Sequence, residues 1–238
     1  MSSDVGQVVA CVGATGGVGT TRTAVELARL AAEHEHTPLL VDTAVATQGL
    51  ARLLVETPAS DLCDALAEPE GLELDAIAVE LPSGLELVAA DAPLCAIAPA
   101  LRAEAAGALD RAIGEAAAVH PLVVIDVPPV ATNLAIAGIT SADAILLLHR
   151  AGDREAVRRG RELIADLAGP APHPVTVGTP AVAELSLPDL PVLRAGAPLA
   201  RPVEDADYRR ALATVAATAG LPIPAPADSG GWLQRLLS

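Results

Sequence analysis

Residues 8–21 read VVACVGATGGVGTT, and this stretch decides the fold of the chain. Its five apolar residues at 8–12 predict a buried strand. Four glycines fall within the seven residues 13–19, and Thr20 and Thr21 stand where a helix begins. Glycines let backbone N–H groups converge on phosphate oxygens, and a helix N-terminus attracts anions. The stretch therefore predicts a phosphate-binding loop between a strand and a helix. A tight turn without a ligand, or a dinucleotide site, is the alternative.

Short aliphatic runs alternate with longer Ala- and Leu-rich stretches along the rest of the chain. Besides Val8–Val12, the runs predict strands near Leu39–Val41, Leu85–Val88, Leu122–Ile125, Ala144–Leu148, Val175–Val177 and Val192–Leu193. The longer stretches predict helices at Thr20–His34, Asp61–Ala67, Leu101–Val119, Asp153–Ala168 and Glu204–Ala219. Strands that are apolar throughout are buried on both faces, and strands that alternate with helices form parallel sheets. We expect a doubly wound α/β fold, with a mostly parallel sheet of about 7–8 strands and helices on both faces.

The composition narrows the class of protein. The 238 residues carry 15 basic and 30 acidic side chains, for a net charge of −15, and all the bases are arginine, so the chain contains no lysine. Such a balance disfavours nucleic acid as a partner, because cations drive that binding. It suits a very salty cytoplasm, and a GC-biased genome is the alternative explanation. Three cysteines at unrelated spacings and the absence of a leader indicate a cytoplasmic protein.

Four segments resemble the ParA/MinD family of P-loop ATPases, of the SIMIBI class. Residues 15–21 read TGGVGTT and match, position for position, the deviant Walker A pattern KGGxGKT. LLVD at 39–42 resembles the strand that leads into switch I, and VVIDVPP at 123–129 resembles the Walker B and switch II segment. ADAILLL at 142–148 resembles the strand that follows. The resemblance covers residues 5–170, is weaker to 221, and implies a MinD-like P-loop NTPase fold.

The resemblance implies ATP and Mg²⁺ as cofactors, a homodimer, and the partner proteins of a positioning system. Such regulators place division, motility, pilus or chromosome-segregation machinery. The implied nucleotide-binding residues are Gly16, Gly17, Val18, Gly19, Thr20 and Thr21, with Arg22 next to them. The implied Mg²⁺ ligands are Thr21 and Asp126.

The departures from the family pattern concern charge. Thr15 and Thr20 occupy the positions of the two family lysines. Ala44 occupies the position where switch I of the family usually has its second aspartate. Asp42 is therefore left as the candidate catalytic carboxylate. Phosphoryl transfer depends on positioned cations, each contributing about 4 kcal/mol at ~4 Å and an effective dielectric constant of about 20. We therefore expect a degenerate nucleotide site with weak or absent ATP hydrolysis.

Two other functions stay open. The chain is a nucleotide-independent pseudo-ATPase scaffold if the loop binds nothing. It is an active ATPase if Arg22 folds back over the loop and replaces the lysine. A solvated arginine on the first helical turn is the plainer interpretation of Arg22.

The organisation predicted is a P-loop domain over 1–221, a Pro/Gly linker over 222–231 and a tail over 232–238. One helical face of the tail carries Trp232, Leu233, Leu236 and Leu237. This tail resembles the membrane-targeting C-terminus of MinD-type proteins, which implies a peripheral position on the inner face of the cell membrane. Docking onto the chain's own domain or into a partner's groove are the alternatives.

The arginine and glutamate group at 154–162 and the five histidines predict no binding site. The first comprises Arg154, Arg158, Arg159 and Arg161 with Glu155 and Glu162, and predicts a solvated helix face, with partner contact or DNA binding as the alternative. The five histidines are scattered and show no metal-ligand spacing with the cysteines. No metal site besides the Mg²⁺ site is therefore predicted.

Overall fold

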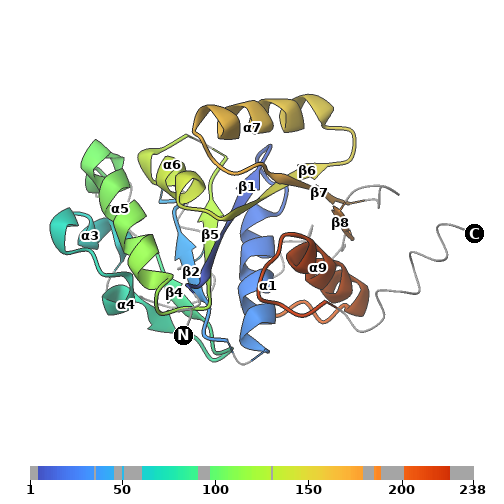
Figure 1. Cartoon of the computed structure of the whole chain (residues 1–238), viewed down its shortest axis with the longest axis horizontal. Coiled ribbons are helices and arrows are strands. Elements are labelled where there is room, and N and C mark those ends of the chain that lie inside the picture. Colours follow the sequence, from blue (N-terminus) through green and yellow to red (C-terminus); the bar gives the residue numbers. More distant parts are fainter. Residues whose placement is uncertain are drawn as a thin grey trace, which may run out of the picture.

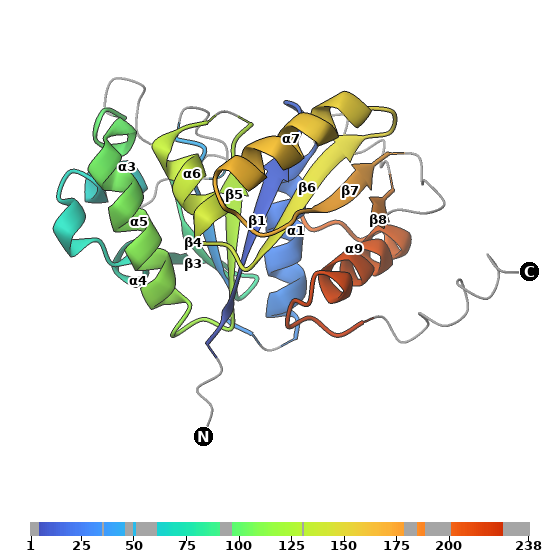
Figure 2. The same cartoon turned by 45° about the horizontal axis from the view of Figure 1, so that its top comes forward.

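The structure is a computed structural model that describes residues 5–34, 36–45, 50, 61–90, 97–129, 131–178, 185–188 and 201–225. Within these residues, eight strands form one sheet in the order β3-β4-β2-β5-β1-β6-β7-β8. Only the β3–β4 pair is antiparallel. Figures 1 and 2 show this twisted sheet with helices on both of its faces. The doubly wound, mostly parallel α/β fold is confirmed.

The strands and helices alternate along the chain. The strands are β1 (Gln7–Gly13), β2 (Leu39–Asp42), β3 (Val79–Glu80), β4 (Glu86–Val88), β5 (Leu122–Val127), β6 (Ala144–Arg150), β7 (His173–Val177) and β8 (Leu185–Leu187). The α-helices are α1 (Thr20–Ala32), α3 (Leu62–Ala65), α4 (Leu74–Ile77), α5 (Ala103–Ala116), α6 (Asn133–Thr140), α7 (Arg154–Asp166) and α9 (Ala206–Thr218). Two short 3-10 helices cover Pro69–Gly71 and Pro99–Leu101.

The strand β1 shows how the sheet separates two cores. Val8, Ala10 and Val12 face the core under α5, α6 and α7, whereas Val9 and Cys11 face the core under α1 and α9. This alternation follows from the two-residue period of a strand, and both faces are buried because helices cover both. In Figure 2, α7 lies in front of β1 and β6, α6 lies beside β5, and α1 lies behind β1. Aliphatic side chains and the buried Tyr208 fill the α1–α9 side.

The predicted elements fall close to the observed ones, with some omissions. The six predicted strands that lie within the described residues and all five predicted helices are present, with ends shifted by a few residues. The sequence analysis missed α6, whose mostly apolar composition gives little helical period, the four-residue helix α4, and the short strands β3 and β8. The predicted strand Val192–Leu193 lies outside the described residues.

Candidate functional site

The loop between β1 and α1 is open. Gly17 and Gly19 have φ angles of 70° and 103°, in the left-handed region that favours glycine. A Cβ placed on Gly16, Gly17 or Gly19 would meet nothing within 4 Å. Gly19 precedes α1 without any side-chain cap, so the first N–H groups of α1 lie at the loop without a capping side chain. These features form an uncapped helix N-terminus beside an unfilled loop, the arrangement in which proteins hold anions.

Thr20 lies against the base of the loop. A Cβ on Gly13 would stand 2.6 Å from Thr20 Oγ1 and 3.1 Å from the Thr15 carbonyl oxygen. Gly13 is therefore required by the close approach of the loop to the end of β1. The hydroxyl of Thr20 offers a hydrogen bond but no charge at this position.

Thr21 and two aspartates meet beside the loop. The parallel β2–β5 register places Asp42 directly opposite Asp126. The hydroxyl of Thr21 forms a hydrogen bond with the Asp126 side chain. A third contact comes from Thr43, whose hydroxyl donates to the Asp126 carbonyl oxygen at 2.7 Å. Carboxylate and hydroxyl oxygens are the ligands that Mg²⁺ prefers, so these side chains fit a Mg²⁺ ion next to a phosphate group.

The two carboxyl groups are buried and influence each other. Burial, together with the charge of Asp126, raises the pKa of Asp42 to about 7, and burial raises the pKa of Asp126 to about 6. Backbone N–H groups of Ala44 and Leu50 donate to Asp42 at 2.8 and 3.4 Å and partly offset this effect. The pair therefore holds protons near neutral pH and gains from a bound cation.

Arg22 is placed differently from both interpretations of the sequence. Its Nη1 donates to Glu26 Oε1 at 3.2 Å and to the carbonyl oxygen of Arg201 at 3.1 Å, and the residue is only 8% exposed. Glu26 also accepts from Arg29 at 2.8 Å and from the backbone of Val203 at 3.1 Å. The solvated arginine is therefore wrong. In this structure Arg22 joins α1 to the segment before α9 and does not fold over the loop.

Arg150 reaches the loop instead. This exposed residue ends β6, and its Nη2 donates to the Gly17 carbonyl oxygen at 2.9 Å. The sequence analysis missed it. Parallel strands carry their ligand-binding residues at their carboxyl ends, and β6 pairs with β1 up to Gly13, so this rule would have identified Arg150.

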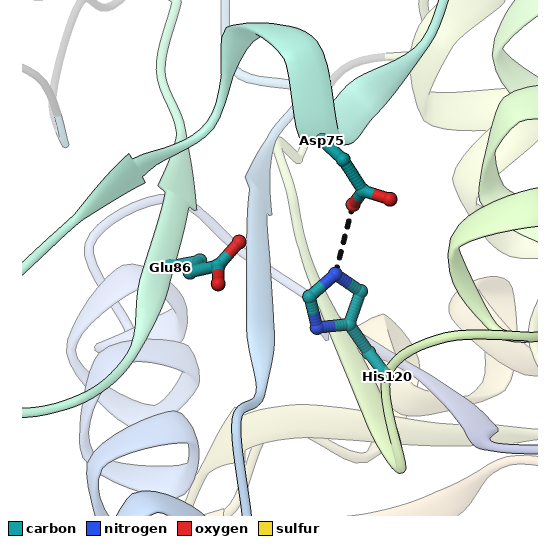
Figure 3. Close-up of side chains that lie close together, drawn as sticks. All are labelled: Asp75, Glu86 and His120. Atoms are coloured by element: carbon teal, nitrogen blue, oxygen red, sulfur yellow. Dashed lines mark hydrogen bonds and ion pairs between the residues drawn. The ribbon is translucent and has the colours of Figure 1, made fainter.

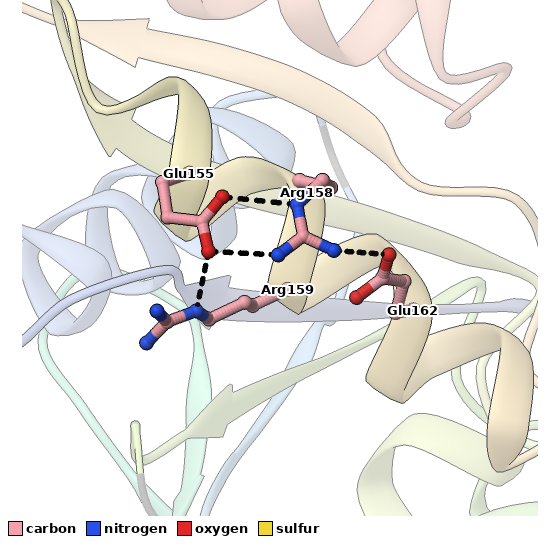
Figure 4. A network of polar contacts seen from close by, with 4 residues as sticks. All are labelled: Glu155, Arg158, Arg159 and Glu162. Carbon is pink, nitrogen blue, oxygen red and sulfur yellow. Dashed lines mark hydrogen bonds and ion pairs between the residues drawn. The ribbon is translucent and has the colours of Figure 1, made fainter.

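A pocket of about 530 Å³ adjoins the loop on the side of α6 and α7. Its walls include Gly13 and Thr15 of the loop, Pro128 and Pro129 after β5, and apolar side chains of α6 and α7. Two residues of its lining, Glu155 and Arg159, belong to the exposed network of Figure 4. The turn after β5 therefore shares a cavity with the loop.

The ion pairs on α7 join side chains of that helix to one another. Arg158 donates to Glu155 at 2.7 and 2.9 Å and to Glu162 at 2.5 Å, and Arg159 donates to Glu155 at 2.8 Å (Figure 4). These hydrogen bonds lower the pKa of Glu155 to about 2. All four side chains are more than half exposed, as expected for a solvated helix face.

The predicted tail residues lie outside the described residues: Trp232, Leu233, Leu236 and Leu237. The same holds for most of the predicted linker, of which only 222–225 are described. Within the described part of the chain, no helix has the length and apolar character needed to cross a bilayer.

Comparisons with known proteins agree with the fold. The family model AAA_31, described as an AAA domain, matches residues 6–156, which is more than half of the chain. No curated protein sequence matches the chain.

Several solved structures share the fold at low identity. The septum site-determining protein MinD of Pyrococcus horikoshii OT3, complexed with Mg-ADP, gives a TM-score of 0.74 at 16% identity and covers 90% of this chain and 97% of its own. A chain of the MinC:MinD cell division protein complex of Aquifex aeolicus gives a TM-score of 0.71 at 16% identity. The match covers 92% of this chain and 98% of that one. Cobyrinic acid a,c-diamide synthase of Mycobacterium smegmatis, with an ATP analogue and magnesium bound, gives a TM-score of 0.66 at 20% identity. The match covers 94% of this chain and 100% of the synthase chain. The family model shows that the chain belongs to the AAA domain family, and the solved structures show that it has a MinD-like P-loop fold.

Proposed function

We propose that this protein is a ParA/MinD-like spatial regulator that binds a nucleoside triphosphate with Mg²⁺ and hydrolyses it weakly or not at all. One observation carries the proposal: Thr21, Asp42 and Asp126 gather beside an open glycine loop that contains no lysine. A structural turn needs neither the open loop nor the pair of buried carboxyl groups. Mg²⁺ held by Thr21 and Asp126 would supply positive charge to the phosphates.

Slow hydrolysis follows from missing charge. Thr15 and Thr20 occupy the positions of the two family lysines, and the buried Ala44 occupies that of a switch I carboxylate. Since the guanidinium of Arg22 is engaged by Glu26, it does not compensate. Losing two cations and a water-orienting carboxylate removes several orders of magnitude in rate. An active ATPase that uses Arg22 is therefore the least favoured function.

Arg150 is our candidate for the remaining positive group at the loop. It lies on the surface, and only one of its N–H groups is used by the Gly17 carbonyl oxygen. A guanidinium can bind phosphate oxygens in a bidentate manner. Binding would be weaker than with a lysine inside the loop, because an exposed charge is screened.

Calorimetric titration with ATP and Mg²⁺, at low and at molar KCl, tests the proposal. We expect saturable binding in the micromolar to low-millimolar range. It should weaken at least about tenfold in Thr21→Val, because this change removes the hydroxyl with little change in shape. Thr214→Val, in α9, is the matched control. If ATP binds neither at low nor at molar KCl, the nucleotide site is refuted and the second candidate, a nucleotide-independent scaffold, is supported. The structural contact of Arg22 with the Arg201 carbonyl oxygen favours this second candidate.

Partners and location are part of the same proposal. We infer a homodimer that contacts partner proteins, supported by the MinC:MinD complex of a similar structure. We also infer that the apolar tail face at Trp232 anchors the dimer to a membrane surface, since two weak tails bind through avidity. Trp232 is the only tryptophan, so its fluorescence should shift to the blue on adding liposomes. No shift with or without nucleotide would refute the membrane anchor.

A further inference from the structure

Three side chains of metal-ligating types meet at the amino-terminal ends of the strands, the end of the sheet opposite the loop. Asp75 lies in α4, Glu86 begins β4, and His120 precedes β5 (Figure 3). One ligand atom from each lies within 4.8 Å of the other two. The amino-terminal ends of β4 and β5 hold two of these residues, so this cluster is separate from the candidate nucleotide site at the carboxyl ends.

His120 is oriented for metal binding. Its Nδ1 lies 2.8 Å from the carbonyl oxygen of Thr37, and since a carbonyl only accepts, Nδ1 carries the proton and donates. Its Nε2 is thereby aimed at the two carboxyl groups and, since a carboxylate also only accepts, donates to Asp75 Oδ1 at 2.8 Å; a bound metal ion would take the place of this proton. The residue is only 4% exposed. A metal-binding histidine is commonly held in this way, through a hydrogen bond from its other ring nitrogen to a backbone carbonyl.

The cluster carries unpaired negative charge. Among the described residues, none forms a hydrogen bond or ion pair with the carboxylate of Glu86, and Figure 3 shows this carboxylate next to the Asp75–His120 pair. The β3–β4 register places Glu80 directly opposite Glu86. Like charges opposite each other on paired strands are destabilising, and a bound cation would offset this repulsion.

We propose that Asp75, Glu86 and His120 bind a divalent cation of the zinc type. One imidazole and two carboxylates suit Zn²⁺ better than Mg²⁺, which prefers oxygen alone. Zinc ligands at about 2.0–2.2 Å stand about 3.3–3.5 Å apart in a tetrahedron. Asp75 would therefore move away from His120 by about half an ångström, and Glu86 would approach. Since the Asp75 side chain is 49% exposed, water can complete the coordination.

A bound ion would connect three parts of the chain. Asp75 belongs to a helix of only four residues, and His120 is linked through Thr37 to the segment before β2. The cation would therefore fasten α4 to the amino-terminal ends of β2, β4 and β5. We expect a stabilising role, independent of nucleotide.

Calorimetric titration of the metal-stripped full chain with ZnCl₂, in excess Mg²⁺, tests the proposal. The excess Mg²⁺ is added to compete with Zn²⁺ for the carboxylates beside the loop, a step that rests on the proposed function. We expect one Zn²⁺ per chain and a higher melting temperature on binding. Glu86→Gln should weaken binding at least about tenfold, the loss that even outer-shell changes produce. The exposed carboxylate of Glu115 on α5 provides the matched control, and Glu115→Gln should bind as the wild type does.

Glu86→Gln decides the test, because the partly exposed side chain of Glu86 makes no hydrogen bond within the described residues, whereas the buried ring of His120 makes two. Replacing Zn²⁺ by Co²⁺ identifies the ligands: imidazole and carboxylate give weak visible bands, and thiolate adds intense near-ultraviolet absorption. No saturable binding to the wild type at micromolar Zn²⁺ would overturn the proposal. So would wild-type affinity in Glu86→Gln, or a thiolate band with Co²⁺.

Discussion

The buried Asp42–Asp126 pair predicts that the protein loses stability as the pH rises. An unfolded aspartate titrates near 3.8, whereas the pKa of Asp42 is raised to about 7 in the folded chain. Between these values the folded state binds more protons than the unfolded state, so the free energy of unfolding falls with increasing pH. The difference of about three pKa units, at about 1.4 kcal/mol each, gives up to about 4 kcal/mol near pH 8.

Asp42→Asn should remove the part of this dependence that Asp42 contributes and leave the smaller part due to Asp126. The amide keeps the shape of the side chain and stays neutral, and its oxygen still accepts the hydrogen bond from Ala44. Without Mg²⁺, the wild type should lose about 2.5–3 kcal/mol relative to this variant between about pH 5 and about pH 8, because about one pKa unit of the difference is already lost at pH 5. Urea unfolding followed by circular dichroism at both pH values measures the difference.

The control for this experiment is Asp207→Asn, which changes an aspartate whose side chain is 81% exposed. Its pH profile should follow that of the wild type, because an exposed carboxylate loses little hydration on folding. Parallel profiles for the wild type and Asp42→Asn would refute our reasoning. They would mean that Asp42 ionises in the folded chain as easily as in the unfolded one.

Three further predictions concern the loop and its surroundings. Mg²⁺ alone should raise the melting temperature near pH 8 in the wild type and have little effect in Asp126→Asn, because the ion neutralises the buried pair; equal shifts in both would contradict this. Thr20→Lys should increase ATP affinity by up to about three orders of magnitude in calorimetry, since a cation ~4 Å from a phosphate contributes about 4 kcal/mol; unchanged affinity would show that the loop does not hold phosphate. Glu26→Ala should lower the free energy of unfolding by about 3–5 kcal/mol in urea titrations, because it leaves the buried Arg22 and Arg29 without their shared carboxylate; a loss below about 1 kcal/mol would mean that other groups hold both arginines.

Much of the architecture could be predicted from local patterns. The apolar run at Val8–Val12 and the glycines after it are consecutive, so the strand, loop and helix follow from neighbouring residues. The alternation of aliphatic runs with helical stretches gave the parallel sheet for the same reason. By contrast, α6 has apolar residues almost throughout and no polar face, so its period carried little information.

The candidate site was predictable only in part. Thr21 and Asp126 could be paired through a family resemblance, and the structure brings them together. Arg22 could not be placed, because one of its partners, the Arg201 carbonyl, is 179 residues away. Arg150 was missed because its contact with Gly17 depends on the pairing of β6 with β1.

By itself, the sequence determined most of the secondary structure, the family and the absence of lysine from the whole chain. All three depend on residue types and on spacings of a few positions. Tertiary structure alone decided which charged groups meet: Asp42 with Asp126 through the β2–β5 register, and His120 with Asp75 and Glu86 where three segments converge. The physical reason is range, because propensity and periodicity act over one or two turns, whereas electrostatic environments are created by segments that only folding brings together.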